Sequence, residues 1–184
     1  TADEEIQSVS GWKLSTDKKS ATKEYAQSIT EEITIKDIAG NETTVQIKII
    51  ATIGFKEGTY NIYEDYIIGI QPETIYEDFV KNIETNSKYK VTDDESEITE
   101  KALITTGQKL QIGEKAYTLV VRGDTNGDGQ ANIKDILIIN KHRLNKAKIV
   151  DEYLLAGDVN KDEKVDLKDI LQINKYRLGK ITNL

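Results

Sequence analysis

Polar and apolar residues alternate along two neighbouring stretches near the N-terminus. In residues 33–35 and 45–49, isoleucine or valine stands at every second position, on either side of Ala39-Gly40-Asn41. Side chains of a strand point to opposite faces with a period of two, so this pattern predicts a hairpin with one buried face. Trp12 and Tyr25 are expected to be its largest core side chains.

The pattern changes between residues 57 and 121. Residues 59–70 predict a strand, and residues 71–86 carry apolar side chains at helical spacing, with Pro72 in the expected first turn. Short apolar runs that predict strands follow at 88–92, 101–105, 109–112 and 116–121. We therefore expect a small α+β module, which runs into the next segment without a linker rich in Pro, Gly or Ser.

Two nearly identical stretches make up most of the remaining chain. Residues 123–146 and 157–180 align with an offset of 34, and 14 of the 24 aligned positions are identical. Apolar residues at helical spacing predict a helix over 132–144 and another over 166–180, while 149–156 suits a short connecting helix. A repeat this close indicates one supersecondary unit, a loop followed by a helix, used twice.

Each repeat opens on a regular series of oxygen-bearing side chains. Counted from the first Asp, they stand at places 1, 3, 5, 7, 9 and 12, which is the ligand spacing of an EF-hand loop. Oxygen ligands in this number suit Ca²⁺ better than Mg²⁺ or Zn²⁺. The sequence therefore predicts two calcium ions. Loop one offers Asp124, Asn126, Asp128, Gln130, Asn132 and Asp135, and loop two offers Asp158, Asn160, Asp162, Lys164, Asp166 and Asp169, with place 7 giving only its backbone carbonyl.

The two loops differ at place 6, where an EF-hand loop turns sharply. Loop one has Gly129 there and loop two has Glu163. If the turn needs a positive φ, a residue other than glycine costs on the order of 1 kcal/mol. Loop two has four side-chain carboxylates at ligand places and loop one has three, so the sequence does not rank their affinities.

Residues 123–184 resemble the type I dockerin module, which consists of two loop–helix calcium repeats joined by a short helix. The resemblance implies an all-α fold held together by calcium, and a cohesin module of a scaffold protein as the partner. It also implies that places 10, 11, 17, 18 and 22 read the partner. These are Ile133, Lys134, Asn140, Lys141 and Asn145 in the first copy, and Leu167, Lys168, Asn174, Lys175 and Gly179 in the second.

The two predicted docking faces are nearly the same, so we expect two alternative docking orientations. Lys134 and Lys141 lie seven residues apart and share a helix face. Ile138 lies between these two lysines on the same face and is a further candidate contact. A solvated face and an additional exposed isoleucine remain the alternatives. The Ser-Thr pair that many dockerins have at places 10 and 11 is replaced by Ile-Lys and Leu-Lys, which leaves the cohesin type open.

The N-terminal hairpin has a resemblance of its own. Its turn, Asp37-Ile38-Ala39-Gly40-Asn41, is similar to that of small immunoglobulin-like repeats on secreted bacterial surface proteins. The resemblance covers about 50 residues, which is short for a sandwich of ~100 residues.

Composition and charge narrow the function classes. The net charge of −7 argues against nucleic acid as a main partner, and the absence of cysteine excludes disulfides and thiolate metal sites. The chain has no apolar run long enough to span a bilayer, so no membrane span is expected. It has no methionine and begins with Thr-Ala-Asp, which suggests a piece of a larger precursor.

These observations predict a multidomain α+β protein: an immunoglobulin-like β repeat over 1–56, a small α+β module over 57–121 and an all-α dockerin over 122–184. The expected function is calcium-dependent docking of a secreted polysaccharide- or glycan-acting bacterial protein to a cohesin-bearing scaffold, without catalysis. His142 and the acidic pairs lack a predicted cleft, so no catalytic residue is assigned. The alternative is a carbohydrate-binding or adhesive fragment of a cell-surface protein, in which the calcium repeats are structural.

Overall fold

The computed structural model describes residues 4–25, 29–50 and 52–184, which form two compact units. The N-terminal unit comprises Thr1–Thr52 and Thr85–Lys88, and the C-terminal unit comprises Ile53–Glu84 and Tyr89–Leu184. Residues 57–121, apart from 85–88, lie in the same unit as 122–184, although the sequence predicts the two ranges as separate modules. Whether they fold independently stays a prediction.

The N-terminal unit is built on the predicted hairpin. Strands β4 (Ile29–Asp37) and β5 (Glu42–Ile49) pair antiparallel, with Ile33 opposite Val45, and β1 (Ile6–Val9) pairs with the other edge of β4. The side chain of Asp37 closes the turn by accepting hydrogen bonds from the backbone and side chain of Asn41, both at 2.8 Å. The hairpin is confirmed, although its apolar face is only half-buried and Val45 is 40% exposed.

Two short strands, β2 (Lys13–Leu14) and β3 (Ala21–Thr22), complete this unit. Trp12 and Tyr25 are half-buried and meet edge to face, with ring centroids 6.2 Å apart. Residues 1–3, 26–28 and 51 of the predicted immunoglobulin-like repeat lie outside the described residues, and the likeness itself stays a prediction.

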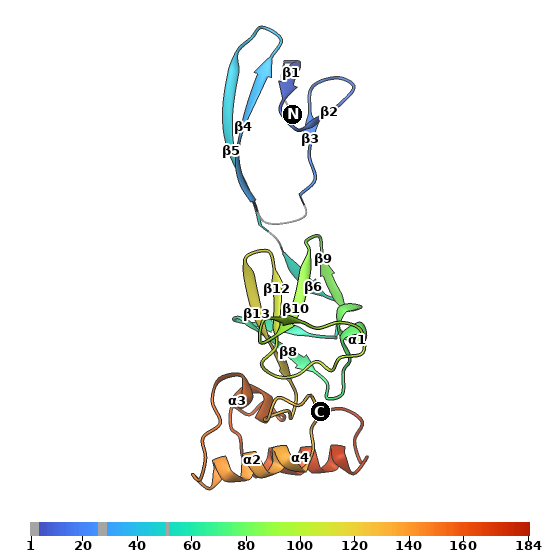
Figure 1. The fold of residues 1–184 in the computed structure, drawn as a ribbon, viewed down its shortest axis with the longest axis vertical. Helices are drawn as coiled ribbons and strands as arrows, with labels where there is room; N and C mark the ends of the chain where they lie inside the picture. Colours follow the sequence, from blue (N-terminus) through green and yellow to red (C-terminus); the bar gives the residue numbers. More distant parts are fainter. Residues whose placement is uncertain (1–3, 26–28, 51) are drawn as a thin grey trace. The chain divides into compact units, whose positions relative to one another are not determined.

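A six-stranded sheet organises the C-terminal unit, with strand order β11-β10-β12-β13-β8-β7 (Figure 1). Its one parallel pair joins β13 to β8, and the other pairs are antiparallel. Ile67, Leu110, Leu119 and Phe79 are fully buried, so apolar burial against this sheet forms its core. The strands are β7 (Asn61–Tyr63), β8 (Tyr66–Ile70), β10 (Tyr89–Asp93), β11 (Ser96–Glu97), β12 (Lys109–Ile112) and β13 (Lys115–Val121); β6 (Ile53–Phe55) and β9 (Ile83–Thr85) form a separate pair.

Three predicted elements of this region are wrong. The strand expected over 59–70 is a hairpin, because the chain turns at Glu64, whose φ is 53°. The helix expected over 71–86 shrinks to α1 (Tyr76–Val80), and Ile83 belongs to β9 instead. Residues 101–105 form no strand beyond an isolated bridge from Leu103 to Ile75, which leaves this segment free to contact other parts of the unit.

The last third of the chain contains helices α2 (Ile133–Arg143), α3 (Asp151–Gly157) and α4 (Leu167–Arg177), close to the predicted ranges. Helices α2 and α4 lie side by side and α3 packs against β13 (Figure 1). They surround a second apolar core, in which Ile139 and Ile173 have no exposed surface. Strand β13 ends at Val121, only three residues before Asp124, which confirms that no linker separates the sheet from loop one.

The predicted fold class is therefore wrong. In the described residues the chain is mostly sheet, with thirteen strands and only four short helices, and residues 122–184 do not stand apart as an all-α domain. The physical reason is that this segment completes its packing on the sheet. Gln71 exchanges two hydrogen bonds with the backbone of Leu184, at 3.0 and 2.9 Å, and Arg122 also donates to the backbone oxygen of Leu184.

We expect Gln71→Ala to lower the free energy of unfolding of the C-terminal unit by about 1–2 kcal/mol, because it removes both hydrogen bonds to Leu184. Urea unfolding followed by far-UV circular dichroism measures this. Gln71→Glu keeps the acceptor but turns the donor into a charged oxygen opposite the backbone oxygen of Leu184, so its loss should be at least as large as that of Gln71→Ala. Equal stability of Gln71→Ala and the parent chain would contradict this interpretation.

Candidate calcium-binding loops

Asp124 opens loop one and is completely buried. Its Oδ1 accepts hydrogen bonds from the backbone N–H groups of Gly127, at 2.7 Å, and Asp128, at 3.0 Å. Its Oδ2 accepts from Gly129, at 3.0 Å, and from Thr106 in the turn before β12, at 2.9 Å. A carboxylate with four such donors is fixed in position, although it carries its charge in a site without solvent.

The end of loop one is also the start of a helix. Asn132 is the N-cap of α2 and its side chain accepts from the backbone N–H of Lys134 at 2.9 Å. Asp135, also completely buried, accepts from the backbone of Asn132 at 2.8 Å and of Thr125 at 2.9 Å. This capping box couples the ligand residues to the first turn of the helix, so a change in the loop affects α2 directly.

Loop two repeats most of this arrangement. Asp166 caps α4 by accepting from Lys168 N–H at 2.7 Å, and buried Asp169 accepts from Asp166 at 2.8 Å and from Asn160 at 3.2 Å. Asp158 is only partly buried and accepts from the backbone of Asp162 at 3.1 Å and of Glu163 at 2.8 Å. In each loop, the carboxylates at places 1 and 12 thus accept hydrogen bonds from backbone N–H groups of the same loop.

Place 6 has a positive φ in both loops, 75° at Gly129 and 65° at Glu163. The expected turn is present, and loop two carries the strain of a non-glycine residue there. Place 4 behaves alike, with Gly127 at 76° and Lys161 at 62°.

Electrostatics favour a cation in these loops. Burial raises the pKa of Asp124, Asp135 and Asp169 above that of an ordinary aspartic acid, because each loses hydration of its charge. The hydrogen bond from Lys168, which reaches Asp162 Oδ2 at 2.6 Å, lowers the pKa of Asp162. A divalent ion would offset the cost of the buried charges.

The donor set fits calcium. All the candidate side chains except Lys164, which would contribute its backbone carbonyl, offer oxygen, and Oδ1 of Asp162 is buried without a hydrogen-bond partner among the described residues. The described residues contain no group of three or more His, Cys, Asp or Glu side chains that could hold a metal ion by themselves. The amides of Asn126, Asn132 and Asn160 and the backbone carbonyl at place 7 would have to complete the sites. The number of ions stays a prediction.

The predicted partner-reading residues fall into two groups. Ile133 and Leu167, 51% and 53% exposed, occupy equivalent positions at the starts of α2 and α4. Lys134 and Lys168 are exposed but pair with the place 5 aspartates of their own loops, Asp128 at 3.1 Å and Asp162 at 2.6 Å. The remaining candidates are exposed or half-buried: Asn140, Lys141, Asn145, Asn174, Lys175 and Gly179.

Ile138 lies differently from its predicted place, because it is partly buried and packs against the second core. Sequence reasoning missed the apolar residues that are exposed on these helices. They stand in equivalent pairs at an offset of 34, a signal present in the repeat itself: Leu137 with Leu171 and Leu144 with Leu178, each 46–53% exposed.

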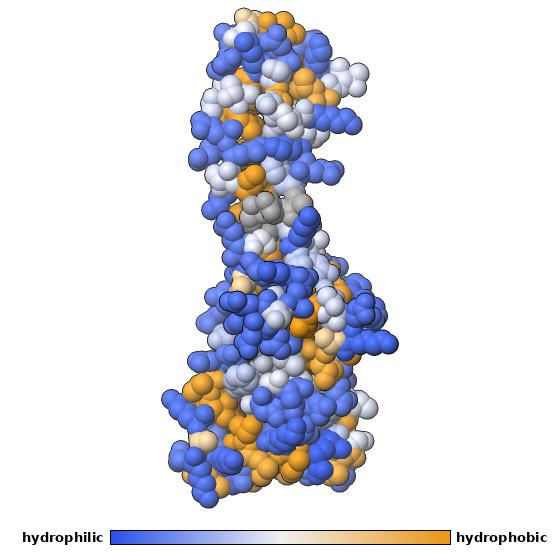
Figure 2. All heavy atoms as spheres, viewed as in Figure 1, coloured by the Kyte–Doolittle hydropathy of each residue, from blue (hydrophilic) through white to orange (hydrophobic). Residues whose placement is uncertain are grey.

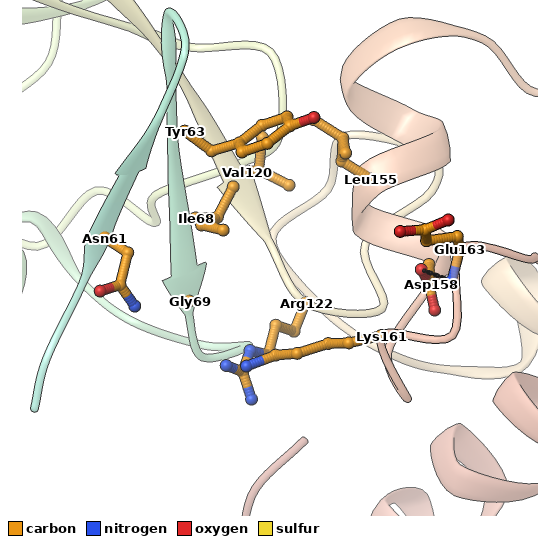
Figure 3. Close-up of a pocket in the computed structure, with 10 residues that line it drawn as sticks. All are labelled: Asn61, Tyr63, Ile68, Gly69, Val120, Arg122, Leu155, Asp158, Lys161 and Glu163. Atoms are coloured by element: carbon orange, nitrogen blue, oxygen red, sulfur yellow. Dashed lines mark hydrogen bonds between the residues drawn. The ribbon is translucent and has the colours of Figure 1, made fainter.

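A cavity of about 280 Å³ lies between loop two and the sheet (Figure 3). Lys161 and Glu163 of loop two line it, together with Tyr63 of β7 and Arg122, which follows β13. At its own places 4 and 6, loop one contacts residues 103–106 and Tyr153 directly.

His142 has a structural partner: its Nδ1 accepts a hydrogen bond from the backbone N–H of Ile149 at 3.0 Å. This contact closes the connection from α2 towards α3. Among the helices that the structure describes, none is both long and apolar enough to cross a membrane.

Comparison with known proteins bears on one part of the chain. Residues 122–178 match the family model of the dockerin type I domain. No curated protein and no solved structure matches the chain. Domains of this family dock onto cohesin modules in a calcium-dependent manner and belong to secreted, cellulosome-type proteins.

Proposed function

Because residues 122–178 are a type I dockerin segment, we propose that this chain attaches a secreted glycan-acting bacterial protein to a cohesin-bearing scaffold and has no catalytic activity itself. Calcium would be held by the Asp and Asn side chains of loops one and two. When bound, it would neutralise their buried charges, while the capping boxes at Asn132 and Asp166 hold the first turns of α2 and α4.

The observation that carries the proposal is the pair of equivalent apolar faces on α2 and α4. Six apolar side chains at matching positions are 46–53% exposed, although comparable side chains elsewhere in the repeat are buried. Apolar side chains gather over the C-terminal helices in the face shown in Figure 2. Apolar positions surrounded by lysine suit a protein partner. The face residues are Ile133, Leu137 and Leu144 on α2, and Leu167, Leu171 and Leu178 on α4.

The equivalence of the two faces supports two docking orientations. Either helix presents the same apolar positions and the same lysines, Lys141 on α2 and Lys175 on α4. A cohesin that recognises one face would accept the other after a half-turn of the dockerin.

The absence of catalysis and the nature of the cargo are supported by other observations. The hydrogen bond from Ile149 gives His142 a structural role, which supports the absence of catalysis. Dockerin modules belong to cellulosome-type proteins, and the match of residues 122–178 supports a glycan-acting protein as the cargo and association with a cell surface through the scaffold.

Calorimetry against a panel of cohesins, with calcium and with EDTA, tests the proposed function. Binding to at least one cohesin in calcium, and its loss in EDTA, is the expected result. If no cohesin binds in calcium, an adhesive or carbohydrate-binding role becomes the better reading, and binding that survives EDTA would contradict the calcium mechanism.

Substitutions on the two faces test the orientations. We expect Leu137→Asp or Leu171→Asp alone to change cohesin affinity by less than about threefold, because the other face remains available. The double variant should weaken binding at least roughly thirtyfold, since charge then faces the partner in both orientations. Leu154→Asp is the matched control, an equally apolar residue of α3 that is 40% exposed and lies outside both faces. A large loss in one single variant would show that a single orientation is used.

A further inference from the structure

The segment Leu103–Gly107 of the sheet region reaches into loop one, which a type I dockerin repeat does not include. Thr106 is 2% exposed, and its backbone N–H donates to Oδ2 of Asp124 at 2.9 Å. Its hydroxyl accepts from Val121 N–H at 3.1 Å and donates to the Val121 carbonyl at 3.3 Å. These two bonds hold Thr106 in place, so that its N–H stays directed at the carboxylate.

The same segment surrounds place 6 of loop one. A Cβ at Gly129 would lie 2.8 Å from the carbonyl oxygen of Ile104, closer than real Cβ atoms approach. On its other side, the carbonyl of Gly129 accepts a hydrogen bond from Glu73 N–H at 2.8 Å. Place 4 is also covered, since a Cβ at Gly127 would lie 3.3 Å from the carbonyl oxygen of Thr106.

Loop two borders a cavity at the places where loop one contacts Leu103–Gly107. Its residues at places 4 and 6, Lys161 and Glu163, extend along the 280 Å³ cavity (Figure 3). In the described part of the chain, no donor outside loop two reaches Asp158. Both loops have positive φ at these places, so backbone conformation does not explain why only loop one has glycine there. Contact with Leu103–Gly107 does explain it.

We propose that Thr106 is a positioning residue of the first calcium site, and that the Leu103–Gly107 segment makes occupancy of this site and folding of the sheet one coupled equilibrium. Among the described residues, the second site receives no hydrogen bond from this segment. The inference rests on the proposed calcium-dependent function and adds to it an asymmetry between two loops of nearly equal sequence.

The physical basis is preorganisation of a ligand. Asp124 is held by four backbone donors, one of which belongs to a different part of the fold, whereas Asp158 is held by two from its own loop. Groups that orient a metal ligand without touching the metal typically change affinity by about 10- to 100-fold when they are removed. Calcium held by Asp124 would in turn keep this carboxylate in place for its bond to Thr106.

Calcium titration calorimetry of the full chain tests the role of Thr106. Thr106→Val removes the hydroxyl that fixes the residue, and should weaken calcium binding about tenfold in the Asp158→Asn background, where only site one remains. The same substitution should leave affinity unchanged in the Asp124→Asn background. Thr106→Ser should restore binding. The matched control is Thr118→Val, because Thr118 is a buried threonine of β13 whose hydroxyl accepts from Lys109 and touches neither loop.

Hydrogen exchange of the parent chain, with and without calcium, tests the coupling even if Thr106→Val does not fold. Calcium should slow exchange in peptides covering 103–107, and Asp124→Asn but not Asp158→Asn should abolish this protection. Protection confined to the two loops, or an equal effect of Thr106→Val on both sites, would overturn the inference and leave the proposed function intact. If the parent chain binds no calcium, both fail.

Discussion

Removal of calcium with EDTA is expected to lower the free energy of unfolding of the C-terminal unit by about 4 kcal/mol for each site previously held at a thousandfold excess of calcium over its dissociation constant. The reason is the burial of three carboxylates, those of Asp124, Asp135 and Asp169, which have no exposed surface. Without a cation, their charges remain in a poorly solvated site, and their raised pKa values express this cost. The same three residues hold the loops to the helices, so the loss should spread through α2 and α4.

Urea unfolding followed by far-UV circular dichroism measures this effect. Trp12 supplies an internal control, because it is the single tryptophan and lies in the N-terminal unit. Its fluorescence transition should not move on chelation. Magnesium added in the presence of a calcium-selective chelator should restore little stability, since Mg²⁺ demands a tighter octahedral site. An unchanged circular dichroism transition in EDTA would count against calcium as a structural ion.

Gly129→Ala is expected to lower the free energy of unfolding of the C-terminal unit by about 3 kcal/mol. A positive φ of 75° costs a non-glycine residue roughly 1–2 kcal/mol, and overpacking adds about 1–3 kcal/mol. The overpacking arises because the new Cβ would lie 2.8 Å from the carbonyl oxygen of Ile104, a backbone atom that cannot rotate away. Chemical denaturation in calcium measures the change.

Glu163→Gly is the natural counterpart in loop two. Its φ of 65° is equally positive, but its side chain is exposed and borders a cavity. Glycine relieves the strain while it makes the unfolded chain more flexible, so the stability should stay within about 1 kcal/mol of the parent. A loss in Gly129→Ala of no more than the roughly 1–2 kcal/mol of backbone strain would show that contact with Leu103–Gly107 does not limit place 6.

The sequence predicts local structure correctly where a single residue spacing decides it. The hairpin of β4 and β5 follows from strict alternation and a turn closed by Asp37 and Asn41. Helices α2 and α4 follow from apolar spacing, and the structure adds that Asn132 and Asp166 cap them. In each case, the bonds that define the element join residues close in sequence.

The predicted structure is wrong where contacts between distant residues compete with local propensity. Residues 71–86 have helical spacing, yet Ile83 is used in a strand and only Tyr76–Val80 is helical. Ile138 has the spacing of an exposed docking residue, yet it packs on the second core, while Leu137 beside it is 53% exposed. A rotation of one residue around a helix axis, about 100°, separates these two environments, and only the packing of α2 on α4 selects between them.

The sequence by itself determined the chemistry of the loops. The spacing of Asp and Asn and the 34-residue repeat are features of residues close in sequence, and they predict oxygen ligands for calcium in two copies. The tertiary structure alone decided that the copies are unequal. Thr106 stands 18 residues before Asp124, and no periodicity links a backbone N–H to a carboxylate at that distance. Gly129 and Glu163 differ because loop one contacts the segment Leu103–Gly107 and loop two borders a cavity, a difference that exists only once the chain has folded.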